Sequence, residues 1–228
     1  MSASEYPRRH FGRRKGWKLR PHQAGLLQTM LPRLLLKPQP GLDPRHYFEP
    51  ATSEVWLEVG FGGGEHLAAQ AKANPHAGII GAEPFVAGMA KLLARIEHEE
   101  LSNIRLYTED AREVMRALPD ATLSRVFILF PDPWPKTRHH KRRLIQMETL
   151  DELARVMRPG AALRFATDDP GYISYALERF IVHSGFGWKA AAPADWRTRS
   201  ADWPETRYEA KAKRAGRACA YLEFTRMT

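Results

Sequence analysis

Short apolar runs alternate with helix-like segments from residue 55 onward, and this alternation limits the folds that the chain can adopt. The apolar runs lie at residues 55–59, 78–82, 104–107, 126–130 and 162–166, and the helical segments lie near residues 65–74, 85–99, 111–118, 142–157 and 172–184. Strands that alternate with helices form βαβ units, in which helices cover both faces of a parallel sheet. The sequence therefore predicts an α/β fold.

The two ends of the chain depart from this alternation. Residues 1–20 are basic and have few apolar side chains, so we expect a disordered arm followed by a single domain over residues 21–228. A short amphipathic helix is expected near residues 26–31. After about residue 186 the pattern indicates a strand, a long loop with Pro and Trp, and a last strand at residues 219–224.

The positive charge is concentrated in three short segments. The net charge is +9, and 17 of the 35 Lys and Arg residues fall within residues 1–20, 136–143 and 207–217, which contain only two acidic residues. The rest of the chain carries more acidic than basic residues. A mildly acidic body with basic segments indicates a polyanionic partner, and nucleic acid is the expected one.

Composition argues against several other classes. No apolar run approaches the roughly 18 to 20 residues that span a bilayer, so no membrane partner is expected. The first 20 residues lack the apolar stretch of a secretory signal. Cys219 is the single cysteine, which excludes an intramolecular disulfide and a cysteine-based metal site. We therefore expect a cytoplasmic protein that binds no metal.

A glycine-rich turn follows the first apolar run. In residues 55–65, Val-Trp-Leu-Glu-Val-Gly-Phe-Gly-Gly-Gly-Glu, an apolar strand leads through glycines into a helix. Gly60 and Gly62 allow the backbone to turn tightly and to approach a ligand closely. In an open α/β sheet, ligands bind beyond the carboxyl ends of the strands. The turn is therefore a candidate cofactor site.

Three acidic residues accompany the first three strands. Glu83 ends the second run, where a carboxylate can accept from ribose hydroxyls, and Asp110 follows the third, where it can accept from an adenine amino group. Glu58 lies inside an apolar strand and needs a partner, for which the sulfonium end of S-adenosylmethionine, with its ammonium, is a candidate. A dinucleotide enzyme is the alternative. It is disfavoured because the turn lacks the last glycine of that motif and because Asp110 has no role in it.

The segment after the fourth run is the most specific in the chain. An apolar strand stops at Pro131-Asp-Pro-Trp134, where prolines on both sides restrict the backbone at Asp132. A carboxylate beside a flat aromatic side chain can pair with the edge of a base and stack on its face. The segment also resembles the Asp-Pro-Pro-aromatic loop of exocyclic amino methyltransferases, which leaves methylation of an RNA or DNA amino group as an alternative.

Basic and acidic residues follow this loop. The run Lys136–Arg143 can hold phosphates while the loop holds a base. Thr167, Asp168 and Asp169 come at the end of the next apolar run, where they either cap a helix or face the site.

Taken together, these motifs resemble those of the bacterial tRNA (guanine-N7-)-methyltransferases. The resemblance covers residues 55–224 and rests on Leu57–Glu65, Gly81–Phe85, Phe130–Arg143, Ala166–Asp168 and Thr206–Glu209. It implies a Rossmann-like class I methyltransferase fold with a mostly parallel seven-stranded sheet and an antiparallel last strand. It also implies transfer of a methyl group from S-adenosylmethionine to N7 of the variable-loop guanine in tRNA. A non-catalytic RNA-binding protein with a methyltransferase fold is the alternative from another class.

The resemblance also implies roles for particular residues. Asp132 resembles the catalytic residue. The positions that contact the cofactor are expected to be Glu58, Gly60, Gly62, Glu83, Asp110 and Asp132, and those that contact the substrate Lys136, Asp168, Thr206, Arg207, Tyr208 and Glu209. The stretch that contacts RNA is expected to be Arg138, His139, His140, Lys141, Arg142 and Arg143. Arg207 stands where the family has Lys, and Ala82 and Pro84 flank Glu83 where bulkier residues are common, but no functional group is lost.

Overall fold

The computed structural model describes residues 12, 14, 16 and 18–228. Most of the predicted disordered arm lies outside these residues. The strands are β1 (Glu54–Val59), β2 (Ala77–Ala82), β3 (Ile104–Tyr107), β4 (Leu123–Leu129), β5 (Met157–Thr167), β6 (Phe186–Trp188) and β7 (Ala220–Arg226). The helices are α1 (Pro21–Thr29), α2 (Leu31–Leu34), α3 (Glu65–Ala73), α4 (Val86–His98), α5 (Ala111–Ala117), α6 (Met147–Val156), α7 (Pro170–Val182), α8 (Ala194–Arg197) and α9 (Arg207–Arg214), with 3-10 turns η1 (Pro44–Tyr47) and η2 (Thr137–Arg142).

The described residues form one seven-stranded sheet in the order β3-β2-β1-β4-β5-β7-β6. Neighbouring strands from β3 to β5 are parallel, whereas β7 runs antiparallel to both β5 and β6. This topology confirms the predicted α/β fold and the antiparallel last strand. The strand order reverses between β1 and β4, and such a reversal opens a crevice beyond the carboxyl ends of the strands.

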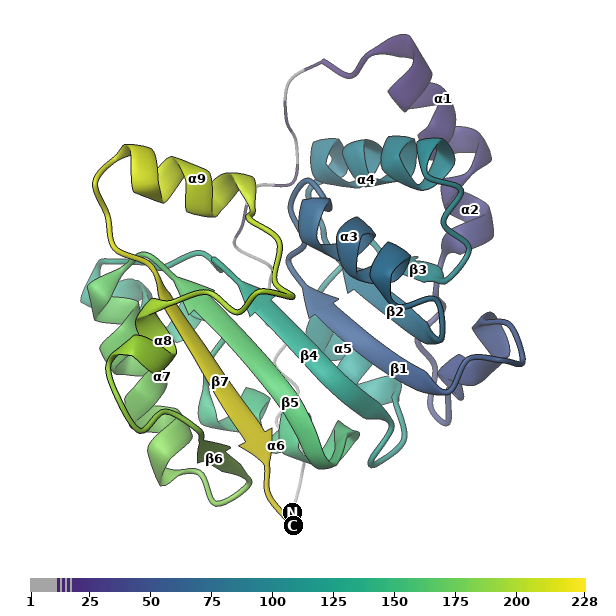
Figure 1. Ribbon diagram of the computed structural model, residues 1–228. Helices are drawn as coiled ribbons and strands as arrows, with labels where there is room; N and C mark the ends of the chain where they lie inside the picture. The colour runs from purple at the N-terminus through teal and green to yellow at the C-terminus, as the bar shows by residue number, and fades with distance from the viewer. Residues whose placement is uncertain (1–11, 13, 15, 17) are drawn as a thin grey trace.

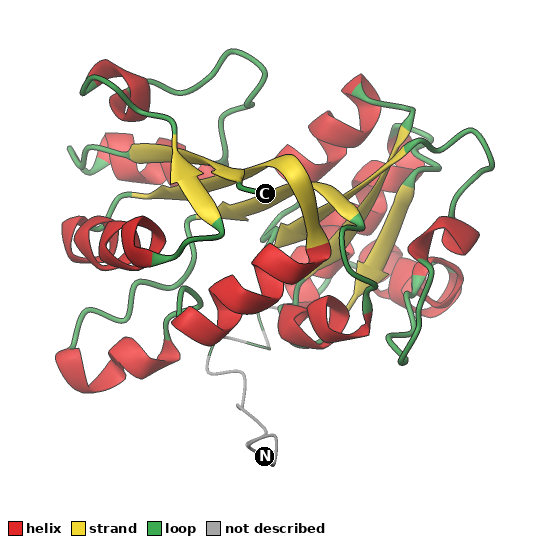
Figure 2. Ribbon diagram, turned by 90° about the horizontal axis from the view of Figure 1, so that it is seen from below, coloured by secondary structure: helices red, strands yellow, loops and turns green. Residues whose placement is uncertain are grey.

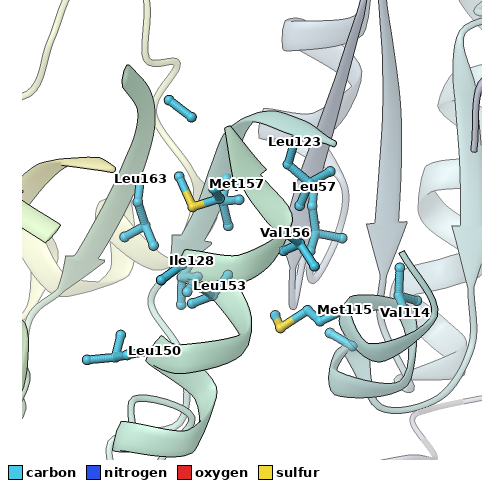
Figure 3. Packing of buried hydrophobic residues seen from close by; sticks show 14 of the residues in the cluster. Leu57, Val114, Met115, Leu123, Ile128, Leu150, Leu153, Val156, Met157 and Leu163 are labelled. Carbon is cyan, nitrogen blue, oxygen red and sulfur yellow. The ribbon is translucent and has the colours of Figure 1, made fainter. Parts of the chain in front are cut away.

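Helices cover the sheet on both faces (Figure 1, Figure 2). One core includes side chains from α5, α6 and α7, and the other includes side chains from α1, α3 and α4. The inner strands are buried on both sides, which explains why they appear in the sequence as unbroken apolar runs. Figure 3 shows Leu57 and Ile128 of the sheet together with Met115 and Leu153 of the helices that cover it.

The segment before α6 differs from the prediction. The sequence pattern predicts a helix from residue 142, but α6 begins at Met147 and is preceded by the 3-10 turn η2. The side-chain amide of Gln146 donates to the carbonyls of His140 (2.9 Å) and Arg143 (3.1 Å), so these carbonyls bond to a side chain instead of continuing a helix. The basic run therefore forms a compact turn at the carboxyl end of the sheet.

The described part of the chain lacks two other features. None of its helices is both long and apolar enough to cross a bilayer. It also has no group of three or more His, Cys, Asp or Glu side chains that could hold a metal ion.

Candidate active site

A cavity of about 580 Å³ opens beyond the carboxyl ends of β1 to β4. The chain leaving each of these strands contributes to its wall, and α9, which leads into β7 at this end of the sheet (Figure 1), closes another side. The sequence-predicted residues in the wall are Gly60, Glu83, Asp110, Asp132, Arg142, Arg207 and Tyr208. Strands that are separate in the sequence thus bring three of the four carboxylates predicted to contact the cofactor to one cavity.

The glycine turn is tied to Glu83 through the backbone. Gly60 and Gly62 have φ angles of +72° and +57°, which only glycine adopts without strain. The amide of Gly62 donates to one carboxylate oxygen of Glu83 (2.8 Å), and the amide of Phe85 donates to the other (2.9 Å). Glu83, which directly follows β2, is therefore held in place by main-chain amides of the glycine turn and of the residue before α4.

Burial raises the pKa of the Glu83 carboxyl above its ordinary value. The amides of Phe85 and Gly62 act in the opposite direction, and the negative charge of Asp132 raises the pKa further. The charge of Asp132 therefore influences the ionisation of Glu83. A positively charged ligand near Glu83 favours its ionised form.

Asp110 has a structural role in addition to its place in the cavity. Its side chain caps α5 by accepting from the amide of Arg112 (3.0 Å), and it also forms an ion pair with the Arg112 guanidinium. The predicted contact with an adenine amino group has to use the remaining lone pairs of this carboxylate.

Glu58 lies outside the cavity wall. Its side chain is 3% exposed and is 2.7 Å from Nδ1 of His66, at the start of α3. One oxygen of this buried carboxylate thus has a histidine of the same chain as its partner. The contact between Glu58 and the cofactor stays a prediction. His66 packs edge-on against Phe127 of β4. Sequence reasoning missed His66, although a buried acid followed eight residues later by a histidine in the first turn of a helix is a usable signal.

The loop after β4 has an unusual backbone. Phe130 and Trp134 have φ angles of +51° and +44°, which cost non-glycine residues about 1 to 3 kcal/mol each. Asp132 lies between them, and its exposed carboxylate has no hydrogen-bond or ion-pair partner among the described residues. The Arg142 guanidinium lies over the Trp134 ring, 4.9 Å from its centre. The loop therefore presents a carboxylate without a partner among the described residues, next to the Trp134 ring that stacks with Arg142.

Residues of α9 reach across to the glycine turn. Thr206 caps the helix by accepting from the amide of Glu209 (3.1 Å). A Cβ atom on Gly62 would lie 2.8 Å from the Tyr208 ring, so the ring packs directly on the turn. The Arg207 guanidinium donates to the Tyr208 hydroxyl (3.0 Å). Two of the predicted substrate-binding residues thus form the part of the cavity wall beside the glycine turn.

Two other predicted substrate-binding acids have partners within the chain. Glu209 is fully buried and pairs with Arg199 (3.1 Å) and Lys213 (2.7 Å), so it holds α9 in place and offers no surface to a ligand. Asp168 pairs with Arg217 (2.6 Å) at the loop after β5 and lies outside the cavity wall. Asp169 caps α7, as the capping alternative predicts.

The basic run divides into an exposed part and a buried part. Lys136, Arg138 and Lys141 are exposed, His139 and His140 are half-buried, and Arg142 reaches the cavity. Arg143 is 1% exposed and its guanidinium donates to main-chain carbonyls. The predicted phosphate contact is thus compatible with the exposed residues, but Arg143 has no surface to offer to a phosphate.

The described end of the N-terminal segment lies against α4. The carbonyl of Arg14 accepts from the amide of Val86 (3.1 Å), and Lys18 and Leu19 belong to the cavity wall. The end of the segment expected to be a disordered arm therefore borders the cavity at positions 18 and 19.

Sequence comparisons extend over nearly the whole chain. A protein-family model described as "Putative methyltransferase" matches residues 52–222. The tRNA (guanine-N(7)-)-methyltransferase of Rhodospirillum rubrum is 53% identical over 224 residues, which cover 96% of this chain and 88% of that protein. The protein of the same name from Brucella melitensis biotype 1 is 49% identical over 219 residues, which cover 95% and 94% of the two chains.

Solved structures of other methyltransferases share the fold. The 16S rRNA methyltransferase KamB matches with a TM-score of 0.57 at 19% identity, covering 81% of this chain and 91% of that chain. An rRNA methylase from Streptococcus thermophilus matches with a TM-score of 0.53 at 11% identity, covering 80% and 91%. At such identities the likeness concerns the arrangement of the sheet and its helices.

Proposed function

Because the chain belongs to the family of tRNA (guanine-N(7)-)-methyltransferases, we propose that it transfers the methyl group of S-adenosylmethionine to N7 of the variable-loop guanine in tRNA, in the cytoplasm. The observation that carries the proposal is Asp132, a carboxylate without a partner among the described residues, at the wall of a cavity that Glu83 and Asp110 also line. The first acid is available to a substrate, Glu83 keeps acceptor capacity for a nucleoside cofactor, and Asp110 borders the same space.

The residues present fit S-adenosylmethionine. A cavity of about 580 Å³ is within the roughly 300 to 1,000 Å³ range of small-molecule sites. Glu83 keeps free lone pairs after accepting from two amides and can accept from ribose hydroxyls, while Asp110 borders the same space. The carboxylates of Glu83 and Asp132 in the wall can face the sulfonium and ammonium charges of this ligand. When bound, this cofactor supplies an electrophilic methyl group.

Asp132 can hold the target base. Guanine presents N7 as an acceptor without a proton, so no general base is needed to create the nucleophile. The Asp132 carboxylate can accept from N1–H and the exocyclic amino group, and its charge stabilises the positive charge that develops on the purine. Trp134 lies beside it and offers a ring on which the base can stack. The remaining requirement is alignment of N7 with the methyl carbon at about 3 to 3.5 Å.

The exposed basic residues can bind the rest of the tRNA. A base in structured RNA has to leave its stack, which costs a few kcal/mol. Lys136, Arg138 and Lys141 lie next to the Asp132 loop, and contacts between them and phosphates can offset that cost.

Incubation of the full chain with tRNA and methyl-labelled S-adenosylmethionine tests the proposal. The expected product is 7-methylguanosine in the digested tRNA. Label on an exocyclic amino group would favour the alternative methyltransferase. Absence of label with intact tRNA binding would favour the non-catalytic RNA-binding protein. A variant with Asp120→Asn, an exposed acid far from the cavity, is the control for Asp132.

A further inference from the structure

Arg143 is a buried cation at the end of the basic run Lys136–Arg143. Its residue is 1% exposed, and no carboxylate of the described residues pairs with it. The guanidinium lies over two aromatic rings, 4.8 Å from the centre of Tyr172 and 4.5 Å from that of Tyr175. A cation close to two aromatic rings is attracted electrostatically to both, and this attraction is stronger where water is excluded.

The same guanidinium joins two loops of the candidate active site. Its Nε donates to the carbonyl of Pro133 (2.7 Å), which lies between Asp132 and Trp134. Another nitrogen donates to the carbonyl of Gly171 (3.2 Å), in the first turn of α7. The loop after β4 and the loop after β5 are therefore held by one planar group that cannot lose its charge.

The two rings are themselves anchored. The Tyr172 hydroxyl accepts from the amide of Ile145 (3.3 Å), and the Tyr175 hydroxyl donates to the side chain of Gln146 (3.0 Å). The position of the guanidinium is thus determined by α7 and by the turn that precedes α6. Only a group with several donors in one plane can stack between the rings and reach both carbonyls.

We propose that Arg143 is a positioning residue that sets the place of Asp132 by holding the Pro133 carbonyl. Arg143 does not touch the substrate and does not bind phosphate. It acts through the strained loop between Phe130 and Trp134, which needs support to keep its left-handed residues. This inference rests on the proposed function, because it gives Asp132 the role of holding the base.

The variant Arg143→Lys separates positioning from phosphate binding. Lysine keeps the charge that a phosphate needs, but it cannot stack as a plane and reach both carbonyls. We expect kcat to fall by about 10- to 100-fold, because small misplacements of a catalytic group have effects of that order. The dissociation constant for tRNA and its salt dependence should stay at the wild-type values. Arg116→Lys, at an exposed position in the last turn of α5 and outside the site, is the matched control and should leave kcat unchanged.

Fluorine NMR of protein labelled with fluorotryptophan reports on the loop without any reaction. The chain has six tryptophans, and the line that disappears in Trp134→Phe identifies Trp134. In Arg143→Lys this line should shift or broaden while the lines of the buried Trp56 and Trp203 stay in place. In Arg116→Lys no line should move. A protein that fails to methylate tRNA would contradict the proposed function, and the spectrum would still decide whether Arg143 holds the loop.

Wild-type kcat together with an unmoved Trp134 line in Arg143→Lys would overturn the inference. If that variant does not fold, Tyr175→Leu provides the same test, since it removes one ring and leaves Arg143 with both carbonyls. There we expect a smaller loss of kcat and a shifted Trp134 line. Wild-type values for both would contradict the positioning role.

Discussion

The carboxylates on the two sides of the cavity are held in different ways. On the cofactor side, Glu83 accepts from the amides of Gly62 and Phe85, and Asp110 is held by Arg112 two residues away. On the substrate side, Asp132 has no partner among the described residues, and its loop is supported from a distance by Arg143. A carboxylate that binds a ligand can thus be held by hydrogen bonds to its own oxygens, as Glu83 is. Alternatively its side chain has no such bonds and its backbone is held by another residue, as we propose for Asp132.

Removal of the Asp132 carboxylate should have the largest effect on kcat. Asp132→Asn keeps the size of the side chain but loses the charge that stabilises the methylated purine. We expect kcat to fall by about 10²- to 10³-fold, as for other groups that stabilise transition-state charge. The tRNA affinity should change little, because phosphate contacts made elsewhere persist. Single-turnover methylation and filter binding measure the two quantities.

Near-normal turnover of Asp132→Asn would remove Asp132 from the centre of the site. The control Asp120→Asn should behave as wild type in both measurements, because its side chain is 78% exposed and pairs only with Arg155.

Loss of the Glu83 carboxylate should weaken the binding of the cofactor and leave the methyl-transfer step itself unchanged. In Glu83→Ala a charged group that accepts from ligand hydroxyls is lost, which costs about 1.5 to 3 kcal/mol. That corresponds to roughly a 10- to 150-fold weaker dissociation constant for S-adenosylmethionine. Calorimetric titration measures it, and Glu97→Gln on the exposed side of α4 is the control. An unchanged dissociation constant would show that Glu83 does not contact the cofactor.

The raised pKa of Glu83 adds a dependence on pH. The ionised carboxylate accepts from hydroxyls, and it is lost as the pH falls through a pKa that burial has raised above the ordinary 4.5. Cofactor affinity should therefore begin to fall at a higher pH than for an ordinary glutamate. Asp132→Asn removes a charge that raises this pKa, so the onset should move to lower pH. If cofactor affinity begins to fall at the same pH in Asp132→Asn as in the wild type, the charge of Asp132 does not influence Glu83.

The cofactor side could be predicted from the sequence because its geometry is local. An apolar strand, a glycine turn and acids at the ends of successive strands imply one cavity, and Gly60, Glu83 and Asp110 all line it. The pairing of Glu58 with His66 could not be predicted, because a buried acid needs some partner and the sequence alone does not show which side chain packs beside it.

The substrate side could be predicted only in part. The prolines around Asp132 indicated its loop, and the structure brings that loop to the cavity. Arg143 and Arg138 look alike in a basic run, yet one is buried against Tyr172 and the other is exposed. The pair of Glu209 with Lys213 follows the four-residue spacing of a helix, but the burial of Glu209 and its pair with Arg199 had no sign in the sequence. Burial of a charge depends on elements that pack against it, and these are distant in the sequence.

Gly62 joins the cofactor side of the cavity to the substrate side, because its amide donates to Glu83 and the Tyr208 ring packs against it. A methyl group there would lie 2.8 Å from the Tyr208 ring, on a backbone with a φ of +57°. Gly62→Ala should therefore destabilise the fold by about 1 to 2 kcal/mol. It should also raise the KM for both cofactor and tRNA severalfold. Gly25→Ala in α1 is the matched control, since nothing lies within 4 Å of its Cβ position. A change in only one of the two KM values would show that Tyr208 does not couple the sides.

The smallest effect is expected from the basic residues at the far end of the N-terminal segment. Lys18 and Leu19 line the cavity, so a test of the arm has to spare them. Replacement of Arg8, Arg9 and Arg13 by Gln removes charge without shortening the chain. For every phosphate that these arginines neutralise, the replacement should lower the slope of log affinity against log salt by about 0.7 to 0.9. The dissociation constant for S-adenosylmethionine should not change. Binding of tRNA at several salt concentrations measures the slope. A wild-type slope would exclude phosphate binding by these three arginines.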